Sequence, residues 1–406
     1  MKIMEGGVCA ADGFTAAGMH AGIKPTSPAD RNDLALICSE VPCTAAGLFT
    51  SNAVKADPVK LDILHLKDGR AQAIMANSFI ANACAPEGME NAQKETELLG
   101  AALGIPQDDI LVSSTGVIGQ RLNIDAISNA IPTLVRKLSK DGSSAAARSI
   151  MTTDTVMKER AVSFQIGGKE VHLGGITKGS GMIAPHMGTM LCYLTTDISI
   201  SGELLKKALT ETVRKTFNRI SIDGDMSTND TCIILANGLA GNAMITEPNE
   251  DYEQLLDAML SICTYLARLM ASDGEGASHL ITCKVEGAKD EATAETIAKS
   301  IINSSLTKTA IYGEDANWGR VLCAAGYSGA SFDPDKTDIT FSSAAGVLPV
   351  CAGGKGLDFD EELGKKVLHE EEVVITLNLH EGDAAVTCWG CDLTYDYVKI
   401  NGDYRT

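Results

Sequence analysis

A segment near the middle of the chain combines residue types that could cut a peptide bond and then carry an acyl group. It runs Lys-Gly-Ser-Gly-Met-Ile-Ala-Pro-His-Met-Gly-Thr from Lys178 to Thr189 and contains almost no charge. A threonine hydroxyl is a weak nucleophile, but cleavage between Gly188 and Thr189 would place a new α-amine, with a pKa near neutral, beside it. Because glycine lets the hydroxyl approach its carbonyl closely, the pair could support an N-to-O acyl shift and self-cleavage before Thr189.

Two plainer interpretations fit the same segment. It could cradle a phosphate, although it lacks the GxxxxGK[ST] spacing and no helix clearly follows it. It could also be an ordinary loop that enters a buried strand, because many Gly-Thr pairs have no chemical role. His186, three residues before Thr189, could assist proton transfer or be structural. The segment alone leaves these interpretations open.

Length and composition predict a globular chain of two or three packed units. The chain has 406 residues, of which 45 % are hydrophobic and 21 % charged, and this balance excludes a disordered protein. No apolar run approaches the length that spans a bilayer, and the first residues lack the basic and apolar regions of a signal peptide. We therefore expect a cytoplasmic protein that does not enter membranes.

The formal net charge of −19 disfavours binding to nucleic acid or to an anionic membrane, because no strong basic patch is visible in the sequence. Acidic residues gather in stretches that are typical of solvated helix faces. A negatively charged substrate would therefore need a specific lysine or arginine to hold it.

Redox and metal chemistry both have weaker support. The twelve cysteines are scattered among apolar neighbours, which indicates reduced, buried thiols. Cys388 and Cys391 have the spacing of a redox motif, but they lie in an alternating run typical of a strand. Asp223, Asp225 and Asp230 could suggest a metal loop, yet the glutamate at the twelfth position of a calcium loop is missing. No histidine spacing indicates a metal, so we expect none.

Strand and helix patterns alternate irregularly, which favours a layered α+β arrangement over repeated parallel βαβ units. A polar, turn-rich stretch at 331–336 is a candidate boundary of a smaller domain. The predicted strands are Leu34–Val41, Ala71–Asn77, Ile110–Ser114, Ala161–Ile166, Met190–Ile198, Thr231–Ala236, Leu280–Val285, Thr337–Phe341, Val373–Leu379 and Ala384–Thr387. The predicted helices are Met89–Leu103, Ile124–Leu138, Gly202–Phe217, Tyr252–Ala271, Glu291–Leu306 and Glu361–Val367.

Several further motifs occur in a fixed order along nearly the whole chain. The motifs are Gly13-Phe-Thr-Ala-Ala-Gly with Ala21-Gly-Ile-Lys, Ser114-Thr-Gly-Val-Ile-Gly, Ile150-Met-Thr-Thr-Asp-Thr, Lys178–Leu191, Asp223-Gly-Asp-Met-Ser-Thr-Asn-Asp-Thr, Ser272-Asp-Gly-Glu-Gly-Ala, Gly313-Glu-Asp-Ala-Asn-Trp-Gly-Arg and Trp389-Gly-Cys-Asp-Leu-Thr-Tyr-Asp-Tyr-Val. Each is weak alone. Together the chain resembles the ornithine acetyltransferase family, also called bifunctional glutamate N-acetyltransferases, whose processing site looks like Lys178–Leu191.

The resemblance implies an enzyme of arginine biosynthesis, an acyltransferase. Self-cleavage between Gly188 and Thr189 would give an α chain, 1–188, and a β chain, 189–406, assembled as an α2β2 heterotetramer. Thr189 would take the acetyl group of N2-acetylornithine and pass it to glutamate by a ping-pong mechanism without a cofactor. Whether acetyl-CoA also serves as a donor stays open. The implied fold is an αββα-like layered α/β sandwich with a smaller second domain.

The resemblance also assigns roles to individual residues. Thr115 and Gly116 would form the oxyanion hole, as a hydroxyl and a backbone donor can. Lys178 could pair with a substrate carboxylate and Glu275 with a substrate ammonium. A one-residue slip would exchange Thr152 for Thr153. The substrate-binding residues that carry over are Thr152, Lys178, Thr189, Glu275, Asn401 and Thr406.

Two regions depart from the family pattern. Gly188 and His186 stand where the family usually has alanine and asparagine, which could change the rate of cleavage. Phe79-Ile80 replace small or polar residues, and Ala85-Pro86 replace Thr-Gly. If this second region borders the site, it could change substrate preference.

Two alternative functions remain compatible with the sequence. An N-terminal-nucleophile aminopeptidase or amidase of related fold would cut itself in the same way but transfer the acyl group to water. A homologue that binds amino acids without cleaving itself would stay a single chain. A hydrolysis assay with and without glutamate would distinguish the aminopeptidase or amidase from an acetyltransferase. The mass of an uncut chain would identify the homologue that only binds amino acids.

Overall fold

The computed structural model describes residues 1–184 and 190–403. The chain divides into two compact units. Unit 1 contains Met1–Gly179, His186–Phe217 and Met226–Leu266, and unit 2 contains Ser180–Pro185, Asn218–Asp225 and Ala267–Thr406. Each unit therefore takes residues from both sides of the predicted cleavage point, and the predicted boundary at 331–336 lies within unit 2.

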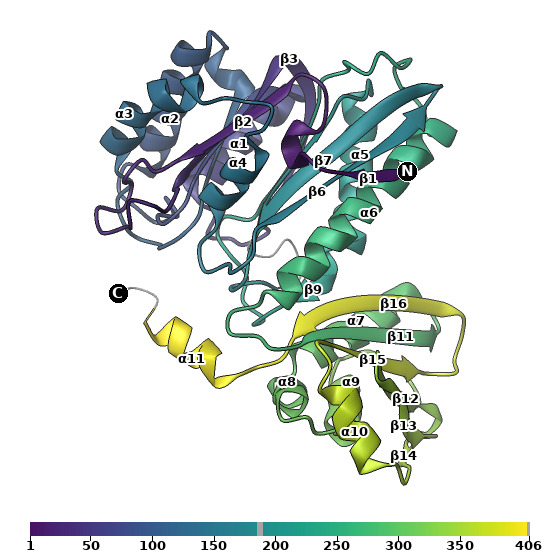
Figure 1. The fold of residues 1–406 in the computed structure, drawn as a ribbon. Helices are drawn as coiled ribbons and strands as arrows, with labels where there is room; N and C mark the ends of the chain where they lie inside the picture. Colours follow the sequence, from purple (N-terminus) through teal and green to yellow (C-terminus); the bar gives the residue numbers. More distant parts are fainter. Residues whose placement is uncertain (185–189, 404–406) are drawn as a thin grey trace. The chain divides into compact units, whose positions relative to one another are not determined.

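A mixed sheet of nine strands, counted over the described residues, forms the centre of unit 1 (Figure 1). Its order is β1-β6-β7-β8-β10-β3-β4-β5, with β2 paired to β3. The strands are β1 (Lys2–Met4), β2 (Phe14–Met19), β3 (Leu34–Phe49), β4 (Arg70–Asn77), β5 (Ile110–Ser114), β6 (Lys158–Ile166), β7 (Lys169–Lys178), β8 (Leu191–Thr196) and β10 (Thr231–Ala236).

Two strands that follow the predicted cleavage point, β8 and β10, lie in the middle of this sheet. Every residue of β8 and of β10 is buried, as their continuous apolar runs require. The two strands are parallel, with Leu191 opposite Thr231, and their outer neighbours are β7 and β3. The segments that enter β8 and β10 therefore meet at the same edge of the sheet.

Helices cover both faces of the sheet in unit 1. On one face, α2 and α3 bury Leu99, Ile127 and Leu134 against the strands, and on the other α4 buries Ala146 and Ile150. The Asn123 side chain caps α3 by accepting from the Ala126 amide at 3.2 Å, which satisfies one of its free N–H groups. The helices are α1 (Asp57–His65), α2 (Gly88–Leu103), α3 (Ile124–Arg136), α4 (Ser143–Ile150) and α5 (Gly202–Lys215).

The helix α6 (Glu250–Ser272) qualifies the expectation that no segment is long enough to cross a bilayer. It is the one helix among the described residues that passes by length and composition. Core helices of globular proteins pass the same test, and more than half of its most apolar window is buried inside the protein. Leu255, Met259 and Leu266 are fully buried. We therefore interpret α6 as a core helix.

Unit 2 has a seven-stranded sheet, counted over the described residues, in the order β14-β13-β12-β15-β11-β16-β9. The helix α7 packs on β11 and β16, and Ile297 and Ile301 lie in its apolar core. The strands are β9 (Ile220–Ser221), β11 (Leu280–Ala288), β12 (Asp338–Ser343), β13 (Gly346–Ala352), β14 (Lys355–Gly356), β15 (Glu372–Asn378) and β16 (Ala384–Cys391). The helices are α7 (Glu291–Asn303), α8 (Ser305–Tyr312), α9 (Trp318–Gly326), α10 (Glu361–Leu368) and α11 (Tyr395–Gly402).

Two sheets with helices packed on them confirm the predicted mixed α/β class. One expected helix, Glu291–Leu306, is wrong in its extent, because the structure divides it into α7 and α8. Ser304 separates the two helices in an extended conformation, and its hydroxyl accepts from the Thr307 amide at 3.2 Å. A serine that caps a new helix is favoured over one that continues the old helix.

Candidate active site

The turn after β5 presents Thr115 and Gly116 in unit 1. The Thr115 amide donates to the Asn77 carbonyl at 3.0 Å, and the Val117 amide donates to the Phe79 carbonyl at 2.9 Å. These bonds tie the turn to the segment that follows β4. Thr115 itself is buried, so its hydroxyl lies in a region shielded from bulk water.

Gly116 is required by its close approach to the neighbouring backbone. Its φ of 131° lies in the region that L-residues rarely adopt, and an added Cβ would lie 2.1 Å from the carbonyl carbon of Phe79. No side chain fits in that space. The Ser-Thr-Gly motif thus has a structural requirement for its glycine, independent of any role as an oxyanion donor.

Lys178 brings a buried positive charge to the Thr115 hydroxyl. It is the last residue of β7 and only 3 % exposed, and its ammonium nitrogen lies 3.0 Å from Thr115 Oγ1. An ammonium group can only donate, so the threonine oxygen is the acceptor of this bond. The hydroxyl proton of Thr115 is then available to a further acceptor.

A second buried lysine and one carboxylate surround this pair. Asp154 accepts from Lys158 Nζ at 2.6 Å, from the Gly179 amide at 2.7 Å and from the Thr152 amide at 3.1 Å. Burial alone would raise the pKa of Asp154, but the charges of Lys158 and Lys178 outweigh it and hold this pKa below its ordinary value. The carboxylate therefore stays ionised and connects Thr152 to the end of β7.

The segment that departs from the family pattern borders this turn. Phe79 has a φ of 75°, a conformation that is unfavourable for a residue with a large side chain. Its ring lies 5.0 Å from the guanidinium carbon of Arg31, and Arg31 donates to the Thr152 carbonyl. Phe79 therefore contacts Arg31, which binds Thr152, and its carbonyl accepts from the Val117 amide in the turn that contains Thr115.

Asn229 and Asp230 connect the two segments that carry the expected chemistry. The Asn229 amide group donates to the carbonyls of Ser114, at 2.8 Å, and Ala81, at 2.6 Å. The Asp230 carboxylate accepts from the Met190 amide at 3.0 Å. Met190 follows Thr189 directly in the chain. The sequence suggests Asp230 only as a possible metal ligand, because nothing in its spacing indicates a partner 40 residues away.

In unit 2, the structure brings Glu275 and Asn401 together. The Asn401 side-chain amide donates to Glu275 Oε2 at 2.7 Å, and the Glu275 amide donates to the Ser180 carbonyl at 2.7 Å. An added Cβ on Gly181 would lie 2.4 Å from the Glu275 carboxyl carbon. The glycine just after Lys178-Gly-Ser thus gives space to a predicted substrate-binding residue.

Asp223 holds the start of the expected processing segment within unit 2. Its carboxylate accepts from the amides of Met182 and Ile183, at 2.5 and 2.9 Å, and Tyr397 Oη lies 3.3 Å from it. Burial raises the pKa of Asp223 above its ordinary value. These contacts favour the turn interpretation of the Asp223 segment over the metal-loop interpretation.

The predicted site residues thus form two groups, one in each unit, and a third set is not described. Unit 1 brings Thr115, Gly116 and Lys178 together and links Thr152 to them through Asp154. Unit 2 pairs Glu275 with Asn401. The residues outside the described part of the chain are His186, Gly188, Thr189 and Thr406.

The strand interpretation of the Cys388–Cys391 segment is confirmed by β16. Burial raises the pKa of Cys388 to about 12 and also raises the pKa of Cys391. A thiol needs a lowered pKa to react as a thiolate. The structure therefore gives no support to redox chemistry at this pair.

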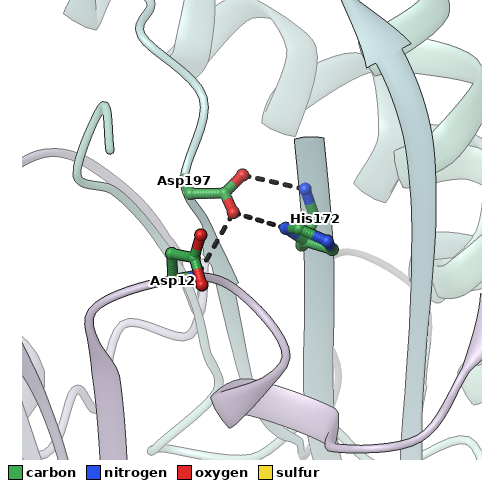
Figure 2. Close-up of side chains that lie close together, drawn as sticks. All are labelled: Asp12, His172 and Asp197. Atoms are coloured by element: carbon green, nitrogen blue, oxygen red, sulfur yellow. Dashed lines mark hydrogen bonds and ion pairs between the residues drawn. The ribbon is translucent and has the colours of Figure 1, made fainter. Parts of the chain in front are cut away.

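One cluster of ligand-type side chains appears only in the structure (Figure 2). The possible ligand atoms of Asp12, His172 and Asp197 all lie within 4.8 Å of one another. Asp197 accepts from the His172 amide at 2.8 Å, from the Asp12 amide at 3.1 Å, and lies 2.6 Å from His172 Nδ1. Because hydrogen bonds already use both Asp197 oxygens, the cluster is explained as a link between three chain segments.

Comparisons with known proteins agree along the full chain. A model of the ArgJ family matches residues 15–406. The arginine biosynthesis bifunctional protein ArgJ of Caldanaerobacter subterraneus subsp. tengcongensis is 49 % identical over 407 residues, which is 100 % of both chains. The protein of the same name from Thermotoga neapolitana is 50 % identical over 397 residues, covering 97 % of this chain and 99 % of the relative. A crystal structure of the Bacillus halodurans protein of that name is 42 % identical and covers 52 % of this chain and 97 % of its own, with a TM-score of 0.49.

Proposed function

Because this chain belongs to the ArgJ family, we propose that it transfers the acetyl group of N2-acetylornithine to glutamate through an acetyl-Thr189 intermediate. Full-length matches at 49 % and 50 % identity make it an acetyltransferase of arginine biosynthesis. The observation that carries the finer proposal is the buried contact of Lys178 with Thr115. It places a positive charge and a hydroxyl donor beside the Gly116 turn, in the unit that contains the strand following Thr189.

In the first half-reaction, Thr189 Oγ attacks the acetyl carbonyl of N2-acetylornithine, and the α-amine of Thr189 takes the hydroxyl proton. The Thr115 hydroxyl, whose oxygen accepts from Lys178, donates to the oxyanion, and the Gly116 backbone lies next to it in the chain. The carbon–nitrogen bond then breaks. The α-ammonium of Thr189 returns its proton to the nitrogen of the departing group. That nitrogen keeps the electron pair of the broken bond, and ornithine leaves with a free α-amine.

In the second half-reaction, the amine of glutamate attacks the acetyl-threonine ester. The proton of this amine passes to threonine Oγ as the ester bond breaks, which gives N-acetylglutamate and restores the enzyme. Substrates of both half-reactions carry a carboxylate, which suits Lys178, and ornithine also carries a side-chain ammonium, which suits Glu275. Thr152, Asn401 and Thr406 complete the proposed substrate-binding set.

The proposal includes self-cleavage between Gly188 and Thr189, because only a free α-amine makes one residue both nucleophile and base. It also includes assembly of the resulting chains as α2β2 and a cytoplasmic location. The cleavage proposal is supported by backbone hydrogen bonds that hold residues on both sides of the segment: the amides of Gly179, Met182 and Ile183 before it and of Met190 after it all donate to aspartate carboxylates.

The first experiment is mass spectrometry of the purified protein under denaturing conditions, with amino-terminal sequencing. We expect two fragments, one of which begins Thr-Met-Leu-Cys-Tyr. T189A should remain a single chain. An uncut wild-type chain would contradict self-cleavage and would favour the homologue that only binds amino acids.

A second experiment separates transfer from hydrolysis. Without glutamate, we expect the cleaved enzyme to release at most one ornithine per active site, as the acetyl-enzyme forms. With glutamate, it should turn over N2-acetylornithine repeatedly and form one N-acetylglutamate per ornithine. Repeated turnover at the same rate without glutamate would instead identify an amidase. Replacing N2-acetylornithine by acetyl-CoA in the same assay tests the donor that the word bifunctional in the relatives' names suggests.

A further inference from the structure

A positive charge that the proposed mechanism does not use lies beside the substrate-binding residues of unit 1. Arg31 belongs to the loop between β2 and β3, and it is half-buried. Its Nη2 atom donates to the Thr152 carbonyl and lies 3.4 Å from the Met151 carbonyl oxygen. Within residues 1–184 and 190–403, no carboxylate forms an ion pair with this guanidinium. Its charge is therefore not neutralised by the part of the chain that the structure describes.

Thr152 is connected both to this arginine and to the end of β7, where Lys178 lies. The Thr152 carbonyl accepts from Arg31, and the Thr152 amide donates to Asp154 Oδ2 at 3.1 Å. The other oxygen of Asp154 accepts from the amide of Gly179, which follows Lys178 in the chain. Hydrogen bonds thus join one proposed substrate-binding residue to two segments that each carry a cationic side chain.

Backbone contacts hold the loop of Arg31 in place. His20 Nδ1 lies 2.9 Å from the Arg31 carbonyl oxygen. The Asp33 carboxylate is fully buried and accepts from the amides of residues 21–23, in the Ala-Gly-Ile-Lys motif. The Ser78 amide donates to the Asp33 carbonyl at 3.0 Å, which ties the loop to the segment that follows β4. The side chain of Arg31 therefore extends from a fixed backbone position.

Phe79 orders the guanidinium group, although its own backbone is strained. Its ring centroid lies 5.0 Å from the guanidinium carbon of Arg31, a contact that attracts the cation and limits its motion. Phe79 has a φ of 75°, which is unfavourable for a large side chain, and it stands where the family has a small or polar residue. Strained residues cluster at functional sites. The stacking contact gives this residue a task that a small side chain could not perform.

The two amino acids of the proposed reaction differ in the charge of their side chains. Ornithine carries an ammonium, which suits Glu275, whereas glutamate carries a second carboxylate, which Glu275 would repel. Lys178 suits the α-carboxylate that both amino acids share. Lys158 cannot serve the second carboxylate, because Asp154 neutralises it and both side chains are fully buried. Glutamate therefore needs a further cation at the site.

We propose that Arg31, ordered by Phe79, binds the side-chain carboxylate of the acceptor glutamate and so determines acceptor specificity. The inference rests on the proposed function. An arginine presents a planar fork of donors that matches a carboxylate. Among the described residues, Arg31 donates through Nη2, which leaves Nε and Nη1 for the ligand. Because the stacking contact orders the guanidinium before glutamate arrives, less entropy is lost on binding.

The test compares glutamate with glutamine as acceptors, at saturating N2-acetylornithine. Glutamine has nearly the same size and lacks the side-chain charge, so the ratio of the two kcat/KM values measures recognition of that carboxylate. R31Q removes the charge and keeps a group that can donate to the Thr152 carbonyl. R160Q is the matched control. Arg160 is also half-buried in unit 1, its guanidinium carbon lies 4.3 Å from the Tyr265 ring centroid, and it has no proposed role.

We expect R31Q to lower the glutamate-to-glutamine ratio at least about tenfold, mainly through the KM for glutamate, because a charge-assisted hydrogen bond is lost. R31K, which keeps the charge but not the fork, should recover part of the ratio. R160Q should keep the wild-type ratio. A wild-type ratio in R31Q would overturn the proposal even if activity fell with both acceptors, because Arg31 would then only hold the Thr152 backbone.

F79L tests the stacking contact and decides the matter if R31Q does not fold. Leucine keeps an apolar side chain and removes the aromatic face, so the ratio should fall about two- to fivefold. A wild-type ratio in F79L would contradict the role of Phe79, and together with an unfolded R31Q it would overturn the whole proposal. A wild-type enzyme that acetylates neither acceptor would overturn the proposed function. Transfer to glutamate with unchanged ratios in the variants would overturn this inference alone.

Discussion

At the scale of single residues, the contact between Lys178 and Thr115 determines which way the threonine hydroxyl can point. Lysine occupies the oxygen as a donor, so the hydroxyl proton is free for an anion. We expect T115V to keep the shape of the turn and to lower kcat by about 10²-fold, as loss of one oxyanion donor does. Steady-state kinetics of acetyl transfer measure this effect.

T212V is the matched control for that variant. Thr212 is also fully buried, and its hydroxyl has no partner among the described residues, but it lies on α5 and has no proposed role. We expect its kcat to stay within about twofold of wild type, because nothing in the proposed mechanism uses that hydroxyl. Equal losses in T115V and T212V would assign the effect to packing.

Gly116 supports a prediction about stability. An alanine there would be strained by the unusual backbone angle, and its Cβ would lie 2.1 Å from the Phe79 carbonyl carbon. We expect G116A to lower the free energy of unfolding by about 2 kcal/mol or more, measured by urea denaturation. G119A separates the two causes. Gly119 also has a positive φ, of 81°, but has no atom within 4 Å of an added Cβ, so its cost should be only about 1–2 kcal/mol.

Some residues of the site were predictable from the sequence and others were not. Thr115, Gly116 and Lys178 carry motifs, and the structure brings them together. Asp154 and Asp230 act through backbone amides of distant segments. Such contacts need only an acceptor at the right place in space, and this leaves no spacing pattern in one sequence.

At the scale of elements, the interface of α1, α2 and β5 buries two carboxyl groups. Asp62 of α1 and Glu95 of α2 each have an oxygen without a partner among the described residues. Burial raises the pKa of Glu95 to about 8 and that of Asp62 well above its ordinary value, and the two groups repel each other when charged. Helix α2 therefore packs best with Glu95 protonated.

This arrangement predicts how stability depends on pH. The native pKa of Glu95 is about 8, whereas the ordinary value is 4.5, so between these values the native state binds more protons than the unfolded state. The free energy of unfolding should then fall as pH rises from 5 to 8, by up to about 1.4 kcal/mol per pH unit. Urea denaturation at several pH values measures the slope.

E95Q should flatten this slope, because glutamine does not ionise and fills a similar volume. D62N at the other group should flatten it further if both carboxyls contribute. E97Q is the control, since Glu97 lies on the same helix with an exposed side chain. An E95Q protein with the full wild-type slope would contradict the assignment to Glu95.

The elements themselves were predictable where their pattern is local. Ile110–Ser114 and Thr231–Ala236 match β5 and β10 at both ends, because continuous apolar runs with turn residues on either side favour buried strands. The strand β7 was not predicted. Its last six residues, from 173 to 178, are Leu-Gly-Gly-Ile-Thr-Lys. Gly174 is required there because an added Cβ would lie 1.7 Å from the Gly7 carbonyl oxygen. No local pattern in the sequence reveals this contact.

At the scale of the whole molecule, the proposed cleavage point does not coincide with a boundary between the units. Residues that follow it supply β8 and β10, which lie between β7 and β3 from the first half of the sequence. Residues that precede it, Ser180 to Ile183, are bonded to Glu275 and Asp223 within unit 2. Each unit therefore contains parts of both proposed chains.

This distribution predicts that the cleaved chains stay together. The strand β8 pairs with β7 over six residue pairs, and β10 pairs with β3 over six more. Pulling the second chain out would expose two edges in the middle of the sheet and the fully buried side chains of β8 and β10, which is costly in water. We expect native size-exclusion chromatography to show one species that contains both fragments, with no free fragment at micromolar concentration.

The uncut T189A protein is the reference for that measurement. Cleavage removes one covalent bond but no strand pairing, so cleaved wild type and T189A should elute together in native buffer. In denaturant, only wild type should divide into two fragments. Separate elution of the fragments without denaturant would mean that β8 and β10 are not held as the sheet order implies, and it would remove the structural basis for an active site assembled from both chains.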